Sequence, residues 1–384
     1  MNSTHQADNG YYLYGSPVSY YTVKVRSYLL YKGLHFSEIR ASDKVAKNII
    51  KPATGGWRVV PVLTTPQGDC IQDSSIILDE LESAHKDRSI TPPGLKQQVV
   101  SSLFELLGDE WLVFPAMHYR WNFKRFNLIY ILNAFGQTRK AHWPKAARFL
   151  GGVVPALKYG NVPRFMLGIN KTNTSALEAW ALQLLDQLDC HFSQYDYLLG
   201  GRPCYGDFSL YGPLHAHLAL DPYPKKHLIQ PRKHLLAWLE RMDETPQHIA
   251  DWLPGDNIPE TLVPILQWQC RDQLHHIHQL MDKTADWINK NPEADTLPRF
   301  IGKADYRMND AEGKRLCTPY SQWMYERVLA PIEKAAAEQR AELTRWLDRQ
   351  NIPFKPIQPN YSLMFQRSVL WRRDRLRTRT LMED

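Results

Sequence analysis

The sequence is poor in cysteine and has no long apolar run. Its five cysteines, Cys70, Cys190, Cys204, Cys270 and Cys317, are scattered over 384 residues without a Cys-x-x-Cys pair. This pattern excludes a disulfide scaffold and predicts free thiols in a reducing compartment. No stretch reaches the ~18 apolar residues of a membrane span, and the N-terminus lacks the apolar core of a secretion signal. We therefore expect a cytoplasmic protein.

The chain also lacks a strong excess of charge of one sign. Its 47 Lys and Arg residues against 40 Asp and Glu give a net charge of +7, too little to indicate a nucleic-acid or membrane partner by itself. Apolar residues make up 43% and charged residues 23%, as in ordinary globular proteins. At ~150 residues per domain, the length allows two or three domains that fold without disulfides or metals.

The first 80 residues alternate the signals of strands and helices. A strand is predicted at 11–15, followed by a helix that Ser19 begins as N-cap and Gly33 ends. Further segments follow the same alternation: a strand at 35–39, a helix at 42–50, strands at 59–65 and 70–72, and a helix from Asp73. This order predicts a compact α/β sandwich whose parallel half has a right-handed crossover.

The rest of the chain has helical periodicity and no further clear strands. The Pro92-Pro93-Gly94 segment cannot continue a helix and predicts a domain boundary, and a second boundary is expected near 253–255. Between them we expect helices at 95–135, 174–200, 205–220 and 232–244, and beyond them at 261–290 and 316–350. The predicted parts are an N-terminal domain (11–92), a helical domain (95–250) and a helical C-terminal extension (255–384).

Basic residues are concentrated in two segments. Residues 124–171 contain nine Lys and Arg and no Asp or Glu, and 355–384 contain seven basic and three acidic residues. The first segment also carries Trp143, Phe149, Tyr159 and Phe165 between its charges. We favour a solvated insertion between helices at 124–171, and the alternative is a site for an anionic surface or polyanion. Nucleic acid is not an expected partner, because no nucleic-acid motif accompanies either segment.

The helix that begins at Ser19 is a candidate anion site. The free N–H groups of a first helical turn and the helix dipole both favour negative charge. For a bound thiolate, the dipole supplies at most ~2 kcal/mol and a hydrogen bond from a hydroxyl ~1.5 to 3 kcal/mol. Together these lower a thiol pKa from ~8.5 to around 6. The alternative is that Ser19 only caps its helix.

Two further elements have the chemistry of peptide recognition. Pro61 follows Val60 inside a strand-like run, where it removes a ladder donor and favours a cis bond. Neighbouring backbone groups are then free to pair with an extended peptide ligand. Asp73 and Ser74, at a helix start, either cap that helix or bind the amine and carboxylate of a zwitterionic ligand.

Three segments in this order resemble the N-terminal domain of the glutathione S-transferase superfamily. They are SYYTVKVRSYLLYKGLHFSE (19–38), VVPVL (59–63) and QDSSIILDELE (72–82). The resemblance implies a thioredoxin-like domain followed by an all-helical domain. It further implies that Ser19 activates or bonds the sulfur of glutathione, and that glutathione is a co-substrate.

The same resemblance implies which residues bind the rest of the glutathione tripeptide. It implies that the Val60 backbone pairs with the cysteinyl unit beside a cis Pro61, and that Asp73 with Ser74 holds the γ-glutamyl end. The remaining candidates, for the glycine carboxylate, are Lys51 and Arg58.

The helical half supports the resemblance but departs from it in detail. The segment GGRPCYGDFSLYGPL (200–214) resembles the family's buried capping box, except that Cys204 replaces the Ser or Thr that caps the helix before Asp207. A thiol is a poorer acceptor, so we expect a weaker or different cap. Because Tyr20 and Thr22 stand where relatives carry proline or a second cysteine, a Ser-type transferase, isomerase or dehalogenase is more consistent than a redox enzyme. Residues 255–384 have no counterpart in typical members.

The segment GDEWLVFPAMHYRWNF (108–123) is rich in aromatic residues and is a candidate wall of the electrophile pocket. Pro115 is expected to kink this helix, with Trp111, His118 and Tyr119 lining the pocket. The alternative is that these side chains form the core between the two domains.

No metal site is expected. Asp272, His275, His276 and His278 share one predicted helix, but metal ligation needs three or four converging ligands. A solvated polar face is favoured there.

These observations lead to two hypotheses. The first is a glutathione S-transferase-like enzyme that activates the glutathione thiolate for attack on a small hydrophobic electrophile, and that forms a homodimer as the resemblance implies. The second is a non-catalytic binding or scaffold protein of the same fold that uses the basic insertion and the extension.

Overall fold

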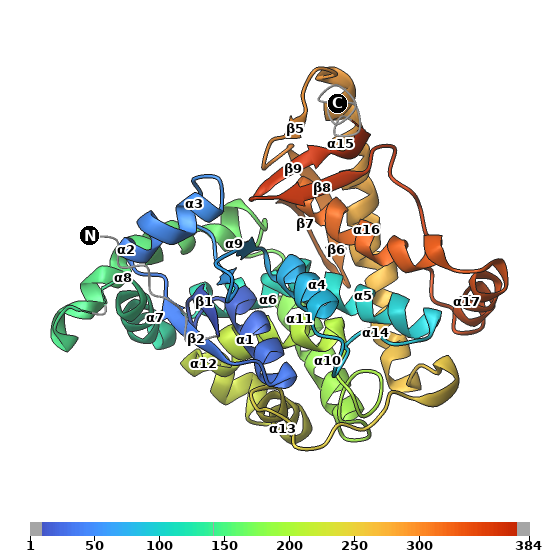
Figure 1. Ribbon diagram of the computed structural model, residues 1–384, viewed down its shortest axis with the longest axis horizontal. Coiled ribbons are helices and arrows are strands. Elements are labelled where there is room, and N and C mark those ends of the chain that lie inside the picture. Colours follow the sequence, from blue (N-terminus) through green and yellow to red (C-terminus); the bar gives the residue numbers. More distant parts are fainter. Residues whose placement is uncertain (1–9, 141, 375–384) are drawn as a thin grey trace.

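The computed structural model describes residues 10–140 and 142–374 (Figure 1). The N-terminal domain has the predicted order of strands and helices, with a four-stranded sheet in the order β2-β1-β3-β4. Strand β1 runs parallel to β2 and antiparallel to β3, as a thioredoxin-like fold requires. Its main elements are β1 (Tyr11–Gly15), α1 (Tyr20–Lys32), β2 (Phe36–Arg40), β3 (Val62–Thr64), β4 (Cys70–Gln72) and α4 (Ser74–Ala84).

The register of this sheet gathers three chain segments at one end. Tyr14 pairs with Val62, and Val62 pairs with Gln72 on its other side. The end of β1, the start of β3 and the end of β4 therefore lie side by side. Ser19, Pro61 and Asp73 are in the segments that leave or enter these strand ends.

A short helical segment connects β2 to β3. It consists of α2 (Asp43–Val45), a π-helical turn (Ala46–Ile50) and α3 (Lys51–Ala53), and it replaces the single helix predicted at 42–50.

The helical domain contains more helices than the sequence predicted. The helix expected at 95–135 is three helices, with interruptions at Trp111–Leu112 and at Phe123. Pro115 lies in the first turn of α6 and does not kink a continuous helix. Because a proline ring clashes with the carbonyl four residues earlier, the chain leaves the helix at Trp111 instead. The elements are α5 (Leu95–Glu110), α6 (Val113–Asn122), α7 (Lys124–Arg139), α8 (Lys145–Tyr159), α9 (Val162–Phe165), α10 (Thr174–Phe192), α11 (Tyr205–Pro213), α12 (Pro222–Pro224) and α13 (Lys233–Met242).

Asp207 organises the start of α11. It is fully buried and accepts hydrogen bonds from the backbone N–H groups of Cys204 (2.9 Å) and Leu198 (3.0 Å) and from Nε1 of Trp238 (3.3 Å). Burial raises its pKa to about 6. The Cys204 thiol donates to Asp207 at 3.3 Å, and the two residues form a capping box at the start of α11.

The extension contains strands as well as helices, and the expectation of no further strands is wrong. Strands β6 and β7 form one hairpin, and β5, β9 and β8 form a separate sheet. The hairpin of β6 and β7 turns at Asn309, which has a φ of 52°. Its strands alternate exposed and buried side chains, but they are short and largely polar. The elements are α14 (Val263–Trp268), α15 (Leu274–Lys290), β5 (Thr296–Leu297), β6 (Lys303–Met308), β7 (Ala311–Leu316), α16 (Pro319–Lys334), α17 (Ala337–Arg349), β8 (Leu363–Gln366) and β9 (Val369–Arg372).

One buried apolar cluster joins all three parts of the chain, from Leu13 in β1 to Leu370 in β9. Helix α16 packs on α5, and the hairpin of β8 and β9 extends toward the N-terminal domain (Figure 1). None of the described helices is long and apolar enough to cross a membrane.

Buried charges accompany the contact between the extension and α5. Glu110, at the end of α5, lies 4.0 Å from Arg315 and accepts a hydrogen bond from the hydroxyl of Ser321. Burial raises the pKa of Glu110 from 4.5 to about 7, although Arg315 and Ser321 oppose that shift. The carboxyl group is therefore largely neutral below neutral pH in the folded protein.

Glu110→Gln tests this buried carboxyl. Because the folded pKa is raised, the contribution of Glu110 to stability is complete below pH 4.5 and is lost as the pH rises through about 7. Gln does not titrate, so the stability of the variant relative to wild type should increase by up to ~3 kcal/mol over this interval. Urea unfolding of both proteins at several pH values measures this difference in the free energy of unfolding. Glu240→Gln, at an exposed position, should show no such trend, and a flat difference for Glu110→Gln would contradict the account.

Candidate functional site

Ser19 begins α1 and is only half-buried. Its Oγ lies 3.5 Å from the backbone N of Thr22, a long and weak capping bond. The hydroxyl therefore retains a proton to donate, beside N–H groups of the first turn that have no helical partner. This combination suits a bound anion.

The Val60-Pro61 bond is cis, as expected from the sequence. Strand β3 begins only at Val62, three residues later than predicted, because proline has no N–H to donate to the ladder. The backbone groups of Val60 form no hydrogen bond within the described residues. They remain available to an extended ligand.

Asp73 and Ser74 form the third part of the site. Asp73 has a φ of 85°, and its Oδ1 caps α4 by accepting from the N–H groups of Ser75 (2.9 Å) and Ile76 (3.3 Å). The adjacent Ser74 is buried, and its Oγ has no hydrogen-bond partner among the described residues. A buried hydroxyl without a partner is unfavourable in the free protein and is ready to bind a ligand.

The two candidates for the glycine carboxylate differ. Arg58 is already engaged, because its guanidinium donates to Asp43 at 2.7 Å and to the carbonyl of Ala41 at 2.9 Å. Asp43 also pairs with Arg139 and Lys140 of the helical domain. Although partial burial opposes it, these three cations hold the pKa of Asp43 well below its usual range. Lys51 is exposed at the start of α3.

The extension reaches this end of the sheet at two points that the sequence did not indicate. The hydroxyl of Tyr320, in α16, donates to Oδ2 of Asp73 at 2.8 Å. The backbone N–H of Ser368, in the turn between β8 and β9, donates to Oε1 of Gln72 at 2.9 Å. The Oγ of Ser368 is buried and has no partner among the described residues. Two unpaired hydroxyls, at Ser74 and Ser368, therefore flank the same turn.

The residues expected in the electrophile pocket lie in the protein core. Trp111, His118 and Tyr119 are at most 3% exposed. Trp111 packs against Phe114, and His118 bonds to Glu178 at 2.8 Å. None of the three lines either of two cavities found among the described residues.

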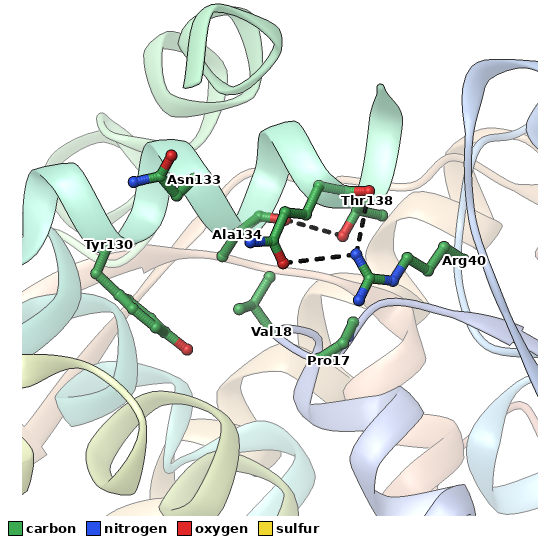
Figure 2. Close-up of a pocket in the computed structure, with 8 residues that line it drawn as sticks. Pro17, Val18, Arg40, Tyr130, Asn133, Ala134 and Thr138 are labelled. Carbon is green, nitrogen blue, oxygen red and sulfur yellow. Dashed lines mark hydrogen bonds between the residues drawn. The ribbon is translucent and has the colours of Figure 1, made fainter. Parts of the chain in front are cut away.

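A cavity of about 150 Å³ lies instead between the β1–α1 loop and α7 (Figure 2). The loop contributes Pro17 and Val18, which immediately precede Ser19. Figure 2 shows these two residues facing α7, with Arg40 and Tyr130 on opposite sides. Helix α7 belongs to the segment 124–171, for which the sequence indicated a solvated insertion or a site for an anionic surface, but not a small-molecule cavity. The lining residues are Pro17, Val18, Arg40, Tyr130, Asn133, Ala134, Gln137 and Thr138.

Two models of one family match this chain. The glutathione S-transferase N-terminal domain matches residues 13–89, and the glutathione S-transferase C-terminal domain matches residues 158–246. They follow in the order of the thioredoxin-like and helical domains described above. The domains at 13–89 and 158–246 are therefore those of the glutathione S-transferase superfamily. No curated protein is similar enough to match the sequence.

Solved structures of this class are similar at low identity. A glutathione S-transferase from Rhodospirillum rubrum F11 is 15% identical with a TM-score of 0.38, over 65% of this chain and 96% of that chain. The beta-etherase LigF from Sphingobium sp. strain SYK-6 is 18% identical with a TM-score of 0.42, over 62% and 96%. A glutathione S-transferase from Methylobacterium radiotolerans, solved with glutathione sulfonate, is 18% identical with a TM-score of 0.35, over 63% and 99%.

Substitution of Ser74 and of the adjacent Ser75 tests whether the Ser74 hydroxyl is unpaired in the ligand-free protein. Ser74→Ala removes a buried hydroxyl without a partner and should stabilise the protein by roughly 1 kcal/mol. Ser75→Ala is the matched control, because Ser75 Oγ bonds to Lys24 (2.9 Å) and Glu105 (2.7 Å) and its loss should destabilise by about 2 kcal/mol. Urea unfolding compares the two. Equal destabilisation by both substitutions would contradict the geometry at Ser74.

Proposed function

We propose that this protein is a Ser-type glutathione S-transferase-like enzyme, which binds glutathione at the end of the N-terminal sheet and activates its thiol. The observation that carries the proposal is that three neighbouring chain segments there offer groups that are unpaired or only weakly hydrogen-bonded within the described residues. They are the hydroxyl and first-turn N–H groups at Ser19, the backbone of Val60, and the buried hydroxyl of Ser74.

These groups match the tripeptide from one end to the other. Backbone pairing with Val60 holds the extended cysteinyl unit, as an added strand does. Ser74 binds the γ-glutamyl carboxylate through its Oγ and its backbone N–H, since Asp73 already accepts from the N–H groups of Ser75 and Ile76. Asp73 Oδ2 binds the amine beside Tyr320, because a carboxylate oxygen accepts more than one hydrogen bond. Lys51, rather than the engaged Arg58, faces the glycine carboxylate in this proposal.

The chemistry takes place at Ser19. Its hydroxyl donates to the sulfur, and the dipole of α1 stabilises the thiolate that forms when the thiol loses its proton. The thiolate then attacks a small electrophile and displaces its leaving group. Pro17 and Val18, which directly precede Ser19 in the chain, line the cavity described above. Its volume of about 150 Å³ suits a small electrophile.

Ser74→Ala tests the binding step. Loss of a hydrogen bond to a carboxylate should weaken glutathione binding roughly tenfold or more, as measured by calorimetry. Ser209→Ala is a matched control, because Ser209 is also buried with an unpartnered Oγ but lies in α11. Equal affinities for wild type and Ser74→Ala would contradict the assignment of the γ-glutamyl end.

Ser19→Ala tests the activation step. The pKa of the bound glutathione thiol should rise by about one unit, seen in a titration of thiolate absorbance, while affinity changes little. Ser42→Ala is the control, because Ser42 caps α2 through a 3.2 Å bond to Val45 N and both substitutions remove a helix cap. An unchanged thiol pKa in Ser19→Ala would overturn the role of Ser19.

A non-catalytic binding protein is the second candidate, and two contacts favour it. Arg58 is occupied by Asp43, and Tyr320 occupies one oxygen of Asp73. Failure of wild-type protein to bind glutathione at millimolar concentration would support this candidate over the enzyme.

The homodimer and the cytoplasmic location stay predictions. Helix α16 covers α5, and Arg327 of α16 pairs with Asp79 of α4. A dimer therefore has to use surfaces that these helices do not already bury.

A further inference from the structure

Exposed apolar side chains are concentrated in one segment. Nine of the thirteen large hydrophobic side chains exposed in the described part of the chain lie between residues 126 and 165. The most exposed are Ile129 (78%), Leu157 (71%), Val154 (63%) and Phe165 (61%). They belong to α7, α8 and α9, which we call the basic hairpin (residues 124–171). Figure 1 places α7 and α8 at the opposite side of the molecule from α17.

Close glycine contacts explain why these side chains point outward. A Cβ on Gly136 of α7 would meet the backbone of Arg148 in α8 at 1.8 Å. A Cβ on Gly152 of α8 would meet the backbone of Leu132 in α7 at 2.1 Å. The two helices thus contact each other through glycine and backbone, and their larger apolar residues remain on the outside.

The same segment is positively charged. Lys124, Arg125, Lys158 and Arg164 are exposed, and none forms an ion pair with a carboxylate among the described residues. Three of these cations lie over a neighbouring aromatic ring: Arg125 over Phe126, Lys158 over Tyr159, and Arg164 over Phe165, at 5.6 to 5.9 Å. Two other cations of the hairpin, Arg139 and Lys140, pair with Asp43 and fasten α7 to the N-terminal domain.

We propose that the basic hairpin docks on an anionic lipid bilayer. Apolar side chains exposed next to unpaired cations, without any acidic residue in the segment, are the composition of an interfacial membrane element. A polynucleotide would neutralise the cations but leave Ile129, Val154 and Leu157 in water. An apolar protein partner would bury those side chains but leave the cations without counter-charge. An anionic bilayer satisfies both.

Vesicle co-sedimentation of the full chain tests the proposal. The probes are phosphatidylcholine vesicles and vesicles of equal parts phosphatidylcholine and phosphatidylglycerol. The charge variant is K124Q/R125Q/K158Q/R164Q, and its matched control is K290Q/K303Q/R345Q/R349Q, at exposed positions outside the hairpin. The apolar variant is I129S/V154S/L157S. Thermal melting checks that each variant is folded, which we expect because the replaced side chains are exposed.

The protein should sediment with the anionic vesicles and not with the neutral ones. The charge variant and the apolar variant should each bind roughly tenfold or more weakly, while the control variant binds like wild type. Four results would overturn the proposal. They are no binding to anionic vesicles, equal binding to neutral vesicles, preferential binding to duplex DNA that the apolar variant retains, and self-association without lipid that the apolar variant abolishes.

Discussion

The buried charge cluster around Lys24 is the interaction on which the rest of the structure depends. The ammonium group of Lys24 is fully buried and donates to Asp109 at 2.6 Å and to Glu105 at 3.2 Å. Burial alone would lower the pKa of Lys24, but these two carboxylates outweigh it and hold the pKa above its ordinary value. Since a buried charge without a partner is very costly, α1 and α5 are fixed relative to each other.

Arg327 of α16 extends the same cluster into the extension. It bonds to Glu105 at 3.2 Å and to Asp79 of α4 at 3.0 Å. The helices that begin at Ser19 and at Ser74 are therefore held against α16 by shared carboxylates. That arrangement also positions Tyr320 on Asp73. The extension is thus part of the candidate site, and its removal would leave buried charges unpaired.

The sequence predicted the N-terminal domain well because its signals are local. Ser19 caps the start of the first helix and Gly33 caps its end. The order of strands and helices along the chain then allows few topologies for the sheet. The sequence could not predict the contact between Tyr320 and Asp73, which are 247 positions apart and share no motif. Strands β6 to β9 escaped prediction because they are short, and β6 and β7 are also largely polar. Their partners lie within the extension, which has no counterpart in typical members of the family. The aromatic segment 108–123 has a composition that is typical of a pocket wall and also of a domain core. The structure buries Trp111, His118 and Tyr119 in the core.

A structure of the protein with glutathione bound tests the central claim most directly. The account predicts the glutathione sulfur within hydrogen-bond distance of Ser19 Oγ, the cysteinyl backbone paired with Val60, and the γ-glutamyl carboxylate on Ser74. Glutathione bound elsewhere, or a site that stays empty at saturating ligand, would contradict it.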